Sequence, residues 1–154
     1  MIPTPVVRRR QVVAAIVLAC AAPVSAGAAA PPNRYTISGM TVYDTKTKLT
    51  WQQTPPSTDY QWTDAQTYCS GLGTTLGGTG WRLPTVKELQ TLLDFSRTGA
   101  PYFDTTAFPS TLKQDFWSRT PVASDSTQAW AVFFENGDTG LFTRTNKLSV
   151  RCVR

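Results

Sequence analysis

Histidine and cysteine, the residues of many active sites, are scarce in this chain. Its 154 residues include no histidine and three cysteines. Without histidine there can be no Ser–His or Cys–His nucleophile pair, no histidine general base and no histidine-containing zinc site. Three cysteines are also too few for an all-thiolate zinc site. We therefore predict no catalytic residue, no metal and no other cofactor.

Carboxylates in the predicted loops are the remaining candidates for catalysis. Two Asp or Glu side chains can hydrolyse a glycosidic bond when they face each other across a cleft. The spacing of the loop carboxylates does not show such a pair, so an envelope-glycan hydrolase stays an alternative to a binding protein. The carboxylates concerned are Asp104, Asp115, Asp125, Glu135 and Asp138.

Basic residues gather near the C-terminus, where the segment from Thr139 to Arg154 contains no acidic residue. Arg151 precedes Cys152 in a predicted strand, so the two side chains should lie on opposite faces. Arginines on such a face could contact the sulfate or carboxylate groups of glycans through paired hydrogen bonds. An ordinary solvated surface is the alternative. The predicted ligand-binding residues are Arg119, Arg144, Lys147 and Arg151.

The first 26 residues have the pattern of a secretory signal peptide. Arg8, Arg9 and Arg10 precede an uncharged stretch over residues 12–22, and Val24-Ser25-Ala26 supplies small residues for cleavage. The stretch is too short to span a bilayer, which takes about 20 residues. Lipidation of Cys20 is an alternative that would anchor the protein to a membrane. We expect an exported protein that is periplasmic, outer-surface or secreted, with a mobile leader over residues 27–34.

Removal of this peptide changes the charge and the cysteine count. It takes away three arginines and no acid, which leaves 12 basic and 10 acidic residues and a net charge of +2. Such a balance gives no support for nucleic-acid binding. Cys69 and Cys152 remain, and an even count in an oxidising compartment predicts one disulfide. Two separate buried thiols are the alternative.

Two short helices are predicted in the first half of the domain, after a hairpin of residues 41–44 and 48–52. The first should begin at Thr63, with Gln66 completing a capping box, and it should turn Cys69 inward. A flexible glycine-rich connection follows over residues 71–80. Thr85 and Glu88 form the capping box of the second helix. Its apolar face contains Val86, Leu89, Leu92 and Leu93.

The last third of the chain has the pattern of β-strands. Residues 116–118, 129–134 and 141–143 are candidate strands, and Asn136-Gly137 is typical of a hairpin turn. The acidic residues of this turn could also suit a calcium ion, but a hairpin needs no metal. A final strand over residues 148–153 should place Leu148, Val150 and Cys152 on one face.

Several motifs together resemble the Lcl C-terminal domain family, which is named after a bacterial collagen-like adhesin. Residues 80–89 read Gly-Trp-Arg-Leu-Pro-Thr-Val-Lys-Glu-Leu, and residues 150–154 read Val-Arg-Cys-Val-Arg. The similarity extends in order from about Tyr43 to Arg154. It also includes Leu49-Thr50-Trp51, Ala65-Gln66-Thr67-Tyr68-Cys69, Phe116-Trp117-Ser118 and Ala129-Trp130-Ala131-Val132.

The resemblance implies an α+β fold of the C-type-lectin-like kind, with two short helices packed on small antiparallel sheets. It also implies that a first-helix cysteine pairs with one in the last strand. Residues 35–154 would form this single domain. The implied role is adhesion or binding at the cell surface, with a glycan such as a glycosaminoglycan, or a surface protein, as partner. The motifs of calcium-dependent lectins are missing. A structural subunit of a surface assembly is a third alternative.

Overall fold

A computed structural model describes residues 31, 33–97, 99–109 and 115–154. The predicted signal peptide, Cys20 and most of the predicted leader lie outside the described residues. The last leader residue, Arg34, is described. Its guanidinium pairs with the buried Asp44 carboxylate at 2.9 Å and also donates a hydrogen bond to the Thr91 carbonyl. None of the helices in the described residues is long and apolar enough to cross a membrane.

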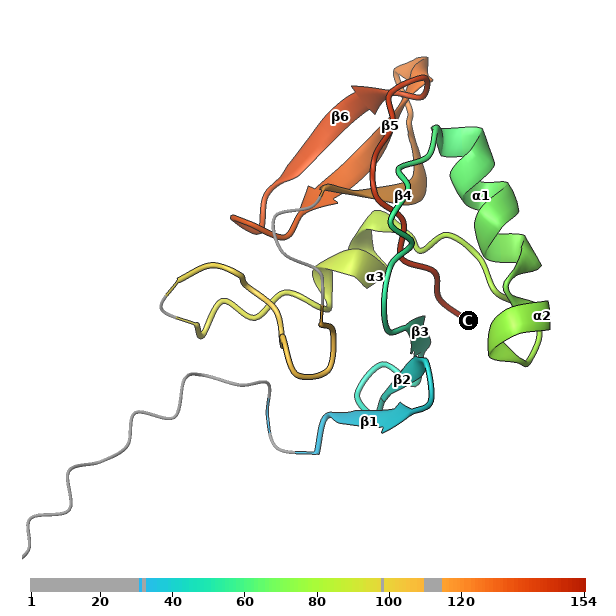
Figure 1. The fold of residues 1–154 in the computed structure, drawn as a ribbon. Coiled ribbons are helices and arrows are strands. Elements are labelled where there is room, and N and C mark those ends of the chain that lie inside the picture. Colours follow the sequence, from blue (N-terminus) through green and yellow to red (C-terminus); the bar gives the residue numbers. More distant parts are fainter. Residues whose placement is uncertain (1–30, 32, 98, 110–114) are drawn as a thin grey trace, which may run out of the picture.

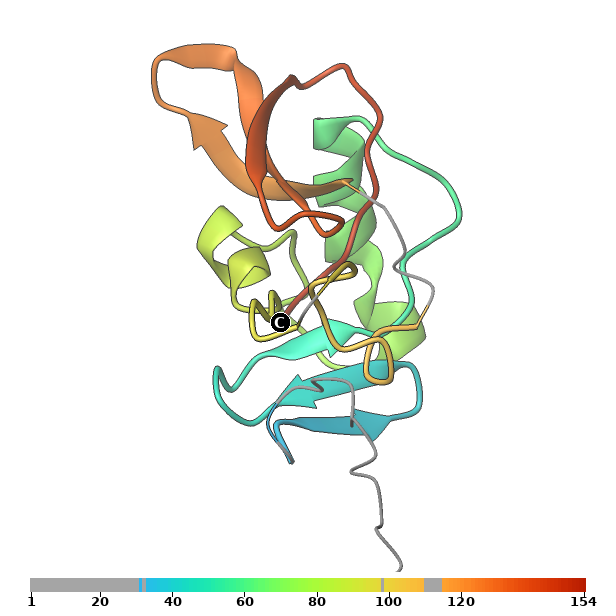
Figure 2. The ribbon, with the colours of Figure 1, turned by 90° about the vertical axis from the view of Figure 1, so that its left-hand side faces the viewer.

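Two antiparallel sheets lie at opposite ends of the molecule (Figures 1 and 2). The first contains β1 (Tyr35–Ser38), β2 (Thr41–Asp44) and β3 (Thr50–Gln52) in that order. The second contains β4 (Asp115–Val122), β5 (Asp125–Phe133) and β6 (Thr139–Thr143). The predicted hairpins are present. β4 and β5 extend further than predicted, because residues 123–124 join them in one long hairpin.

Three helical segments connect the sheets, and the resulting α+β class is the predicted one. They are α1 (Trp62–Gly71), α2 (Gly73–Leu76) and α3 (Val86–Gln90). The capping box of α3 is confirmed, because Thr85 and Glu88 each accept a hydrogen bond from the other's backbone N–H. The glycine-rich segment was predicted as a flexible connection, but its first half forms α2.

The predicted capping box of α1 is wrong. The helix begins at Trp62, one residue early, and its N-cap Gln61 makes no side-chain cap bond. The backbone N–H of Trp62 instead donates to the carbonyl of Arg144, beyond β6. A distant part of the chain therefore satisfies this helix end, while the Gln66 amide donates to the Trp62 carbonyl.

The C-terminal segment, residues 148–154, runs between the two sheets and pairs with both. Ser149 forms a bridge with Phe116 of β4, and Val153 forms bridges with Trp51 of β3 and with Arg82. Five consecutive residues of this segment, 149–153, are buried. Isolated bridges replace the predicted strand, but the predicted alternation is confirmed. Val150 and Cys152, with Leu148 packed against them, belong to one apolar cluster, and Arg151 contacts the rings of Phe108 and Phe116 on the other side. Both sides of the segment therefore face the protein interior.

The predicted disulfide is present between Cys69 of α1 and Cys152 of the C-terminal segment. Both cysteines are fully buried, in a cluster that also contains Trp81, Leu83 and Trp117. A second cluster, around Trp51 and several phenylalanines, contains residues of both sheets and of α3. The disulfide thus fixes α1 to the segment that joins the two sheets.

Candidate functional site

A groove opens beside α1 and is the clearest candidate for a binding site. We call it the α1 groove. Its volume is about 430 Å³, within the usual range of small-ligand sites. One wall comes from α1, a second from the segment that precedes α3, and a third from β4. The lining residues are Gln66, Thr67, Ser70, Trp81, Arg82, Leu83 and Arg119.

Hydrogen bonds to backbone carbonyls hold these three walls together. The indole N–H of Trp62 donates to the carbonyl of Ser118 at 2.8 Å, which fixes the start of α1 against β4. The N–H of Arg119 donates to the carbonyl of Pro84 at 2.7 Å, which joins β4 to the segment before α3. Gln66 lies one helical turn after Trp62, so its side chain projects along the same face of α1. Groups far apart in sequence therefore meet in one groove.

Arg82 contributes a guanidinium whose charge is already compensated. Its two terminal nitrogens donate to the two carboxylate oxygens of Glu88, at 2.8 and 2.6 Å. Burial alone would raise the pKa of Glu88, but the hydrogen bonds from Arg82 and Thr85 outweigh it and hold the pKa at about 2. Glu88 is therefore ionised at neutral pH and is poorly suited to donate a proton in catalysis.

Arg119 is the exposed cation of the groove. Salt bridges in the described part of the chain join Arg34 to Asp44 and Arg82 to Glu88, and none of them involves Arg119. Its five donors have a planar arrangement that matches a carboxylate or a sulfate. An anionic group that enters the α1 groove would meet this guanidinium first.

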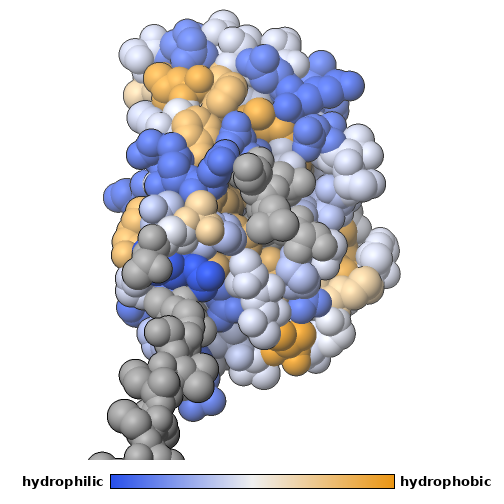
Figure 3. All heavy atoms as spheres, turned by 60° about the vertical axis from the view of Figure 1, so that its left-hand side comes forward, coloured by the Kyte–Doolittle hydropathy of each residue, from blue (hydrophilic) through white to orange (hydrophobic). Residues whose placement is uncertain are grey.

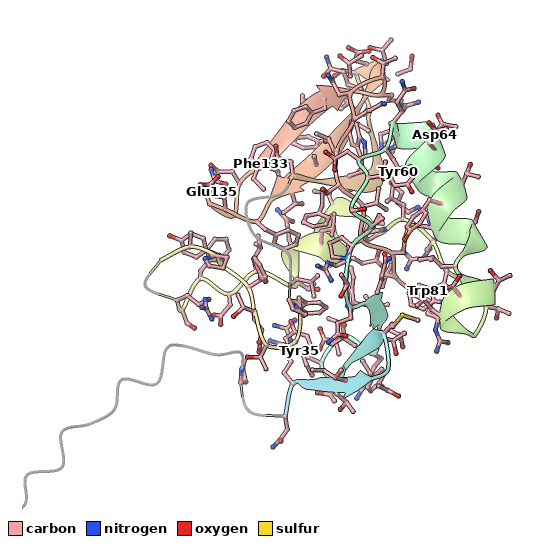
Figure 4. The ribbon with its side chains drawn as sticks, in the orientation of Figure 1. Tyr35, Tyr60, Asp64, Trp81, Phe133 and Glu135 are labelled. Carbon is pink, nitrogen blue, oxygen red and sulfur yellow. A yellow bond between two sulfur atoms is a disulfide. The ribbon has the colours of Figure 1, made fainter. Side chains whose placement is uncertain are left out.

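Two arginine–tryptophan contacts flank the groove. At the start of α1, the guanidinium of Arg144 lies 4.0 Å from the ring centre of Trp62. At the other end, the guanidinium of Arg154 lies 5.5 Å from the ring centre of Trp81. Such cation–π contacts orient an arginine without neutralising its charge. Figure 4 shows Trp81 beside α2 and the C-terminal end of α1.

A second hollow of about 450 Å³ shares Ser70 and Trp81 with the α1 groove. We call it the glycine-side hollow, because the glycine-rich segment forms most of its wall. No Asp or Glu lines either hollow among the residues that the structure describes. The remaining lining residues are Gly71, Gly73, Thr74, Gly78, Thr79 and Gly80.

The four predicted ligand-binding residues do not share one surface. Arg119 lines the α1 groove, whereas Arg144 is half-buried against Trp62 and Lys147 is exposed in the turn after β6. The prediction of an exposed Arg151 is wrong. Its side chain is fully buried, contacts the rings of Phe108 and Phe116, and donates to the carbonyls of Gln52 and Gln53. The C-terminal segment has no solvent face, so strict alternation could not expose Arg151.

Sequence reasoning missed three contributors to the site: Gln66, Trp81 and Arg154. The sequence analysis gives Gln66 a role in a helix cap and gives Trp81 no role beyond the motif of residues 80–89. Arg154 was counted in the basic C-terminal segment without a role in binding. The available signals were the adjacent Trp81 and Arg82 and the two arginines of residues 151–154. Only the fold shows that Arg154 contacts Trp81.

Several of the loop carboxylates take part in turns. Asp104 and Asp125 each accept a hydrogen bond from the backbone N–H two residues later, and Asn136 donates to Asp138 in the β5–β6 turn. Burial raises the pKa of Asp115, and the negative charges of Glu135 and Asp59 raise it further. Figure 4 places Glu135 at the β5–β6 turn, away from Trp81.

No group of three Cys, Asp or Glu side chains within the described residues is arranged to hold a metal ion. The predicted hairpin turn between β5 and β6 is confirmed, with Gly137 in the left-handed region at φ 82°.

Large apolar side chains are exposed on several separate elements. On the face shown in Figure 3, hydrophobic side chains lie in separate patches among hydrophilic ones. A surface that assembles into a permanent complex usually presents a larger continuous apolar area. The exposed residues concerned are Ile37, Met40, Tyr43, Phe95 and Leu141.

The fold and the groove define a disulfide-bonded α+β domain with a basic surface groove that no carboxylate lines. Residues 40–154 match the family model described as the Lcl C-terminal domain, and the chain belongs to this family. The match confirms the resemblance found in the sequence motifs. No curated protein showed significant sequence similarity to the chain.

Proposed function

We propose that the protein is an exported, non-catalytic module that binds acidic extracellular glycans through the α1 groove. The observation that carries this proposal is the position of Arg119. Its exposed guanidinium lines a groove in which the other arginine, Arg82, is neutralised by Glu88. The groove therefore offers one cation for an anionic group of a ligand.

The other lining groups suit the hydroxyls of a sugar. Gln66 carries an amide, and Thr67 and Ser70 carry hydroxyls, on the helix side of the groove. The Ser70 hydroxyl donates to the Thr67 carbonyl, so its oxygen remains available as an acceptor. A ligand with one acid group and several hydroxyls, such as a uronic acid or a sulfated sugar, would use both kinds of contact.

Export is part of the proposal and is supported by the disulfide. Disulfides persist in oxidising compartments, which include the bacterial periplasm and the cell surface. The predicted signal peptide over residues 1–26 supports the same location. The C-type-lectin-like character of the fold is also a proposal, since its support is the resemblance of the sequence motifs. A lectin-like domain would fit a ligand-binding role without catalysis.

The test is a glycan array probed with protein purified from the periplasm of a bacterium that expresses the full chain. Binding should be strongest for sulfated or uronate-containing glycans and should not require calcium. Arg119→Ala should weaken it by about tenfold or more, since a charge-assisted bidentate contact is lost. The matched control is Lys46→Ala, which removes one exposed positive charge from the turn between β2 and β3. Absence of glycan binding together with a stable self-assembled oligomer would contradict the proposal.

A further inference from the structure

We propose that the α1 groove is one half of a two-part site and that the glycine-side hollow is the other half. The ligand would be a linear acidic oligosaccharide longer than a disaccharide. One of its acidic groups would bind Arg119 and another would bind Arg154. This inference rests on the function proposed above and adds the length and the charge spacing of the ligand.

The two hollows are neighbours on one surface. Ser70 and Trp81 line both of them, so an extended ligand that is bound in one could reach the other across these two residues. Their volumes of about 430 and 450 Å³ are each of the size that takes a small ligand. A ligand short enough to fit in one hollow would make no contact with the other.

Arg154 is held in place beside the glycine-side hollow. Its backbone exchanges two hydrogen bonds with Thr50 of β3, at 2.8 and 2.9 Å. Its guanidinium lies against the ring of Trp81 and against Gly78. A Cβ at Gly78 would lie 2.7 Å from a guanidinium nitrogen, so a side chain at this position would displace the arginine. An exposed cation that is already ordered loses little entropy when it binds an anion.

The glycine-side hollow is suited to a sugar ring rather than to an apolar group. Gly73 lies so close to the Gly78 carbonyl that a Cβ at Gly73 would be 2.7 Å from the carbonyl oxygen. This part of the wall therefore has no room for a side chain at Gly73. The hydroxyl of Thr74 donates to the Gly71 carbonyl, which leaves its oxygen free to accept a hydrogen bond from a ligand. Backbone and hydroxyl groups of this kind bind sugar hydroxyls.

Each half of the two-part site has its own cation. Arg119 lines the α1 groove and Arg154 lies over Trp81 beside the glycine-side hollow, whereas Arg82, which also lines the α1 groove, is neutralised by Glu88. No salt bridge joins Arg154 to an acid within the described residues. A ligand whose acidic groups are separated by a neutral portion matches this arrangement. The site therefore favours charge spacing over charge density.

The test uses hyaluronan fragments of two, four and six sugars, in which a neutral sugar separates successive carboxylates, titrated calorimetrically into the protein purified from periplasm. The tetrasaccharide should bind about tenfold tighter than the disaccharide, because its second half reaches the second subsite at high effective concentration. The affinity of the hexasaccharide should exceed that of the tetrasaccharide by no more than about twofold. This small gain reflects the additional positions in which a longer chain can bind to the same two subsites. Arg154→Gln keeps part of the stem over Trp81 and removes the charge. In this variant the gain from two to four sugars should disappear.

Further variants separate the two subsites. Arg119→Ala should weaken binding of both short and long fragments, and Arg154→Lys should keep part of the gain with length. Lys46→Ala is the control for loss of one positive charge. Thermal unfolding of each variant shows whether it is folded. If Arg154→Gln does not fold, the affinities of Arg154→Lys still test the role of Arg154.

Three results would overturn the inference. Equal affinity for two and four sugars in the unaltered protein would exclude the second subsite and leave the proposed function standing. A gain with length that survives Arg154→Gln would exclude Arg154 as the second cation. Failure of every fragment to bind would refute the proposed function itself, and the two-part site with it.

Discussion

The two arginines that line the α1 groove differ in what surrounds their charge. Arg82 is paired with Glu88, which also caps α3, so its charge serves the fold. The backbone of Arg119 is fixed through the Pro84 carbonyl, and none of the salt bridges among the described residues involves its guanidinium. The same residue type therefore has a structural role in one wall of the groove and a proposed binding role in another.

Glu88→Gln should destabilise the protein by about 1–2 kcal/mol at neutral pH, after allowance for solvent screening of this partly exposed pair. Folding lowers the pKa of Glu88 from 4.5 to about 2. The ion pair thus contributes fully above the unfolded pKa and loses its contribution as the pH falls through the folded pKa. Urea unfolding of both proteins at several pH values measures this.

The stability difference between the two proteins should shrink as the pH falls from 5 toward 2. Asp64→Asn is the control, since it removes an exposed carboxylate of α1 without breaking a salt bridge. A difference that is constant across this pH range would show that the carboxylate charge of Glu88 does not stabilise the fold.

Arg151→Met should destabilise the protein by about 2 kcal/mol or more, because two buried carbonyl oxygens lose their charged donor. These are the carbonyls of Gln52 and Gln53. Burial lowers the pKa of Arg151 to about 9, so the side chain is still charged at neutral pH. The measurement is urea unfolding, with Lys147→Met as the control for an exposed cation nearby. A variant as stable as the parent would mean that the hydrogen bonds of Arg151 give no net stability.

At the scale of elements, the sequence predicts an element correctly where the contacts that define that element lie within it. The capping box of α3 lies within four consecutive residues, and the β5–β6 turn is specified by Asn136 and Gly137. The start of α1 is different, since its first N–H is satisfied by Arg144. No pattern in residues 61–66 contains that contact. The burial of Arg151 was not predicted for a related reason. Alternation places Arg151 on the face opposite Cys152, and that face would be exposed only if no other part of the chain packed against it.

Loss of the disulfide should cost about 4 kcal/mol in the chain-entropy model, since it closes a long loop. The two cysteines are 83 residues apart in sequence. Urea unfolding of the oxidised protein, of the reduced protein and of the Cys69→Ala, Cys152→Ala double variant measures the effect. The reduced form keeps the buried sulfur atoms, so it separates the cross-link from simple packing. Equal stability of the oxidised and reduced proteins would contradict the expectation.

At the scale of the whole molecule, the fold class and the disulfide could be predicted, but the groove could not. Its walls come from α1, from the segment before α3 and from β4. Contacts such as that between Trp62 and the Ser118 carbonyl set their relative positions. This contact joins residues 56 positions apart, beyond the range of any local pattern. Arg119 was found as a basic residue, but its neighbours in the groove were not.

The position of the C-terminal segment also bears on how the fold closes. This segment supplies pairing partners to both sheets, the second cysteine, the buried Arg151 and the guanidinium over Trp81. Without it the two sheets lack the segment between them, so closure depends on contacts of long sequence separation. Folding is therefore expected to be slower than for a chain whose contacts are mostly local.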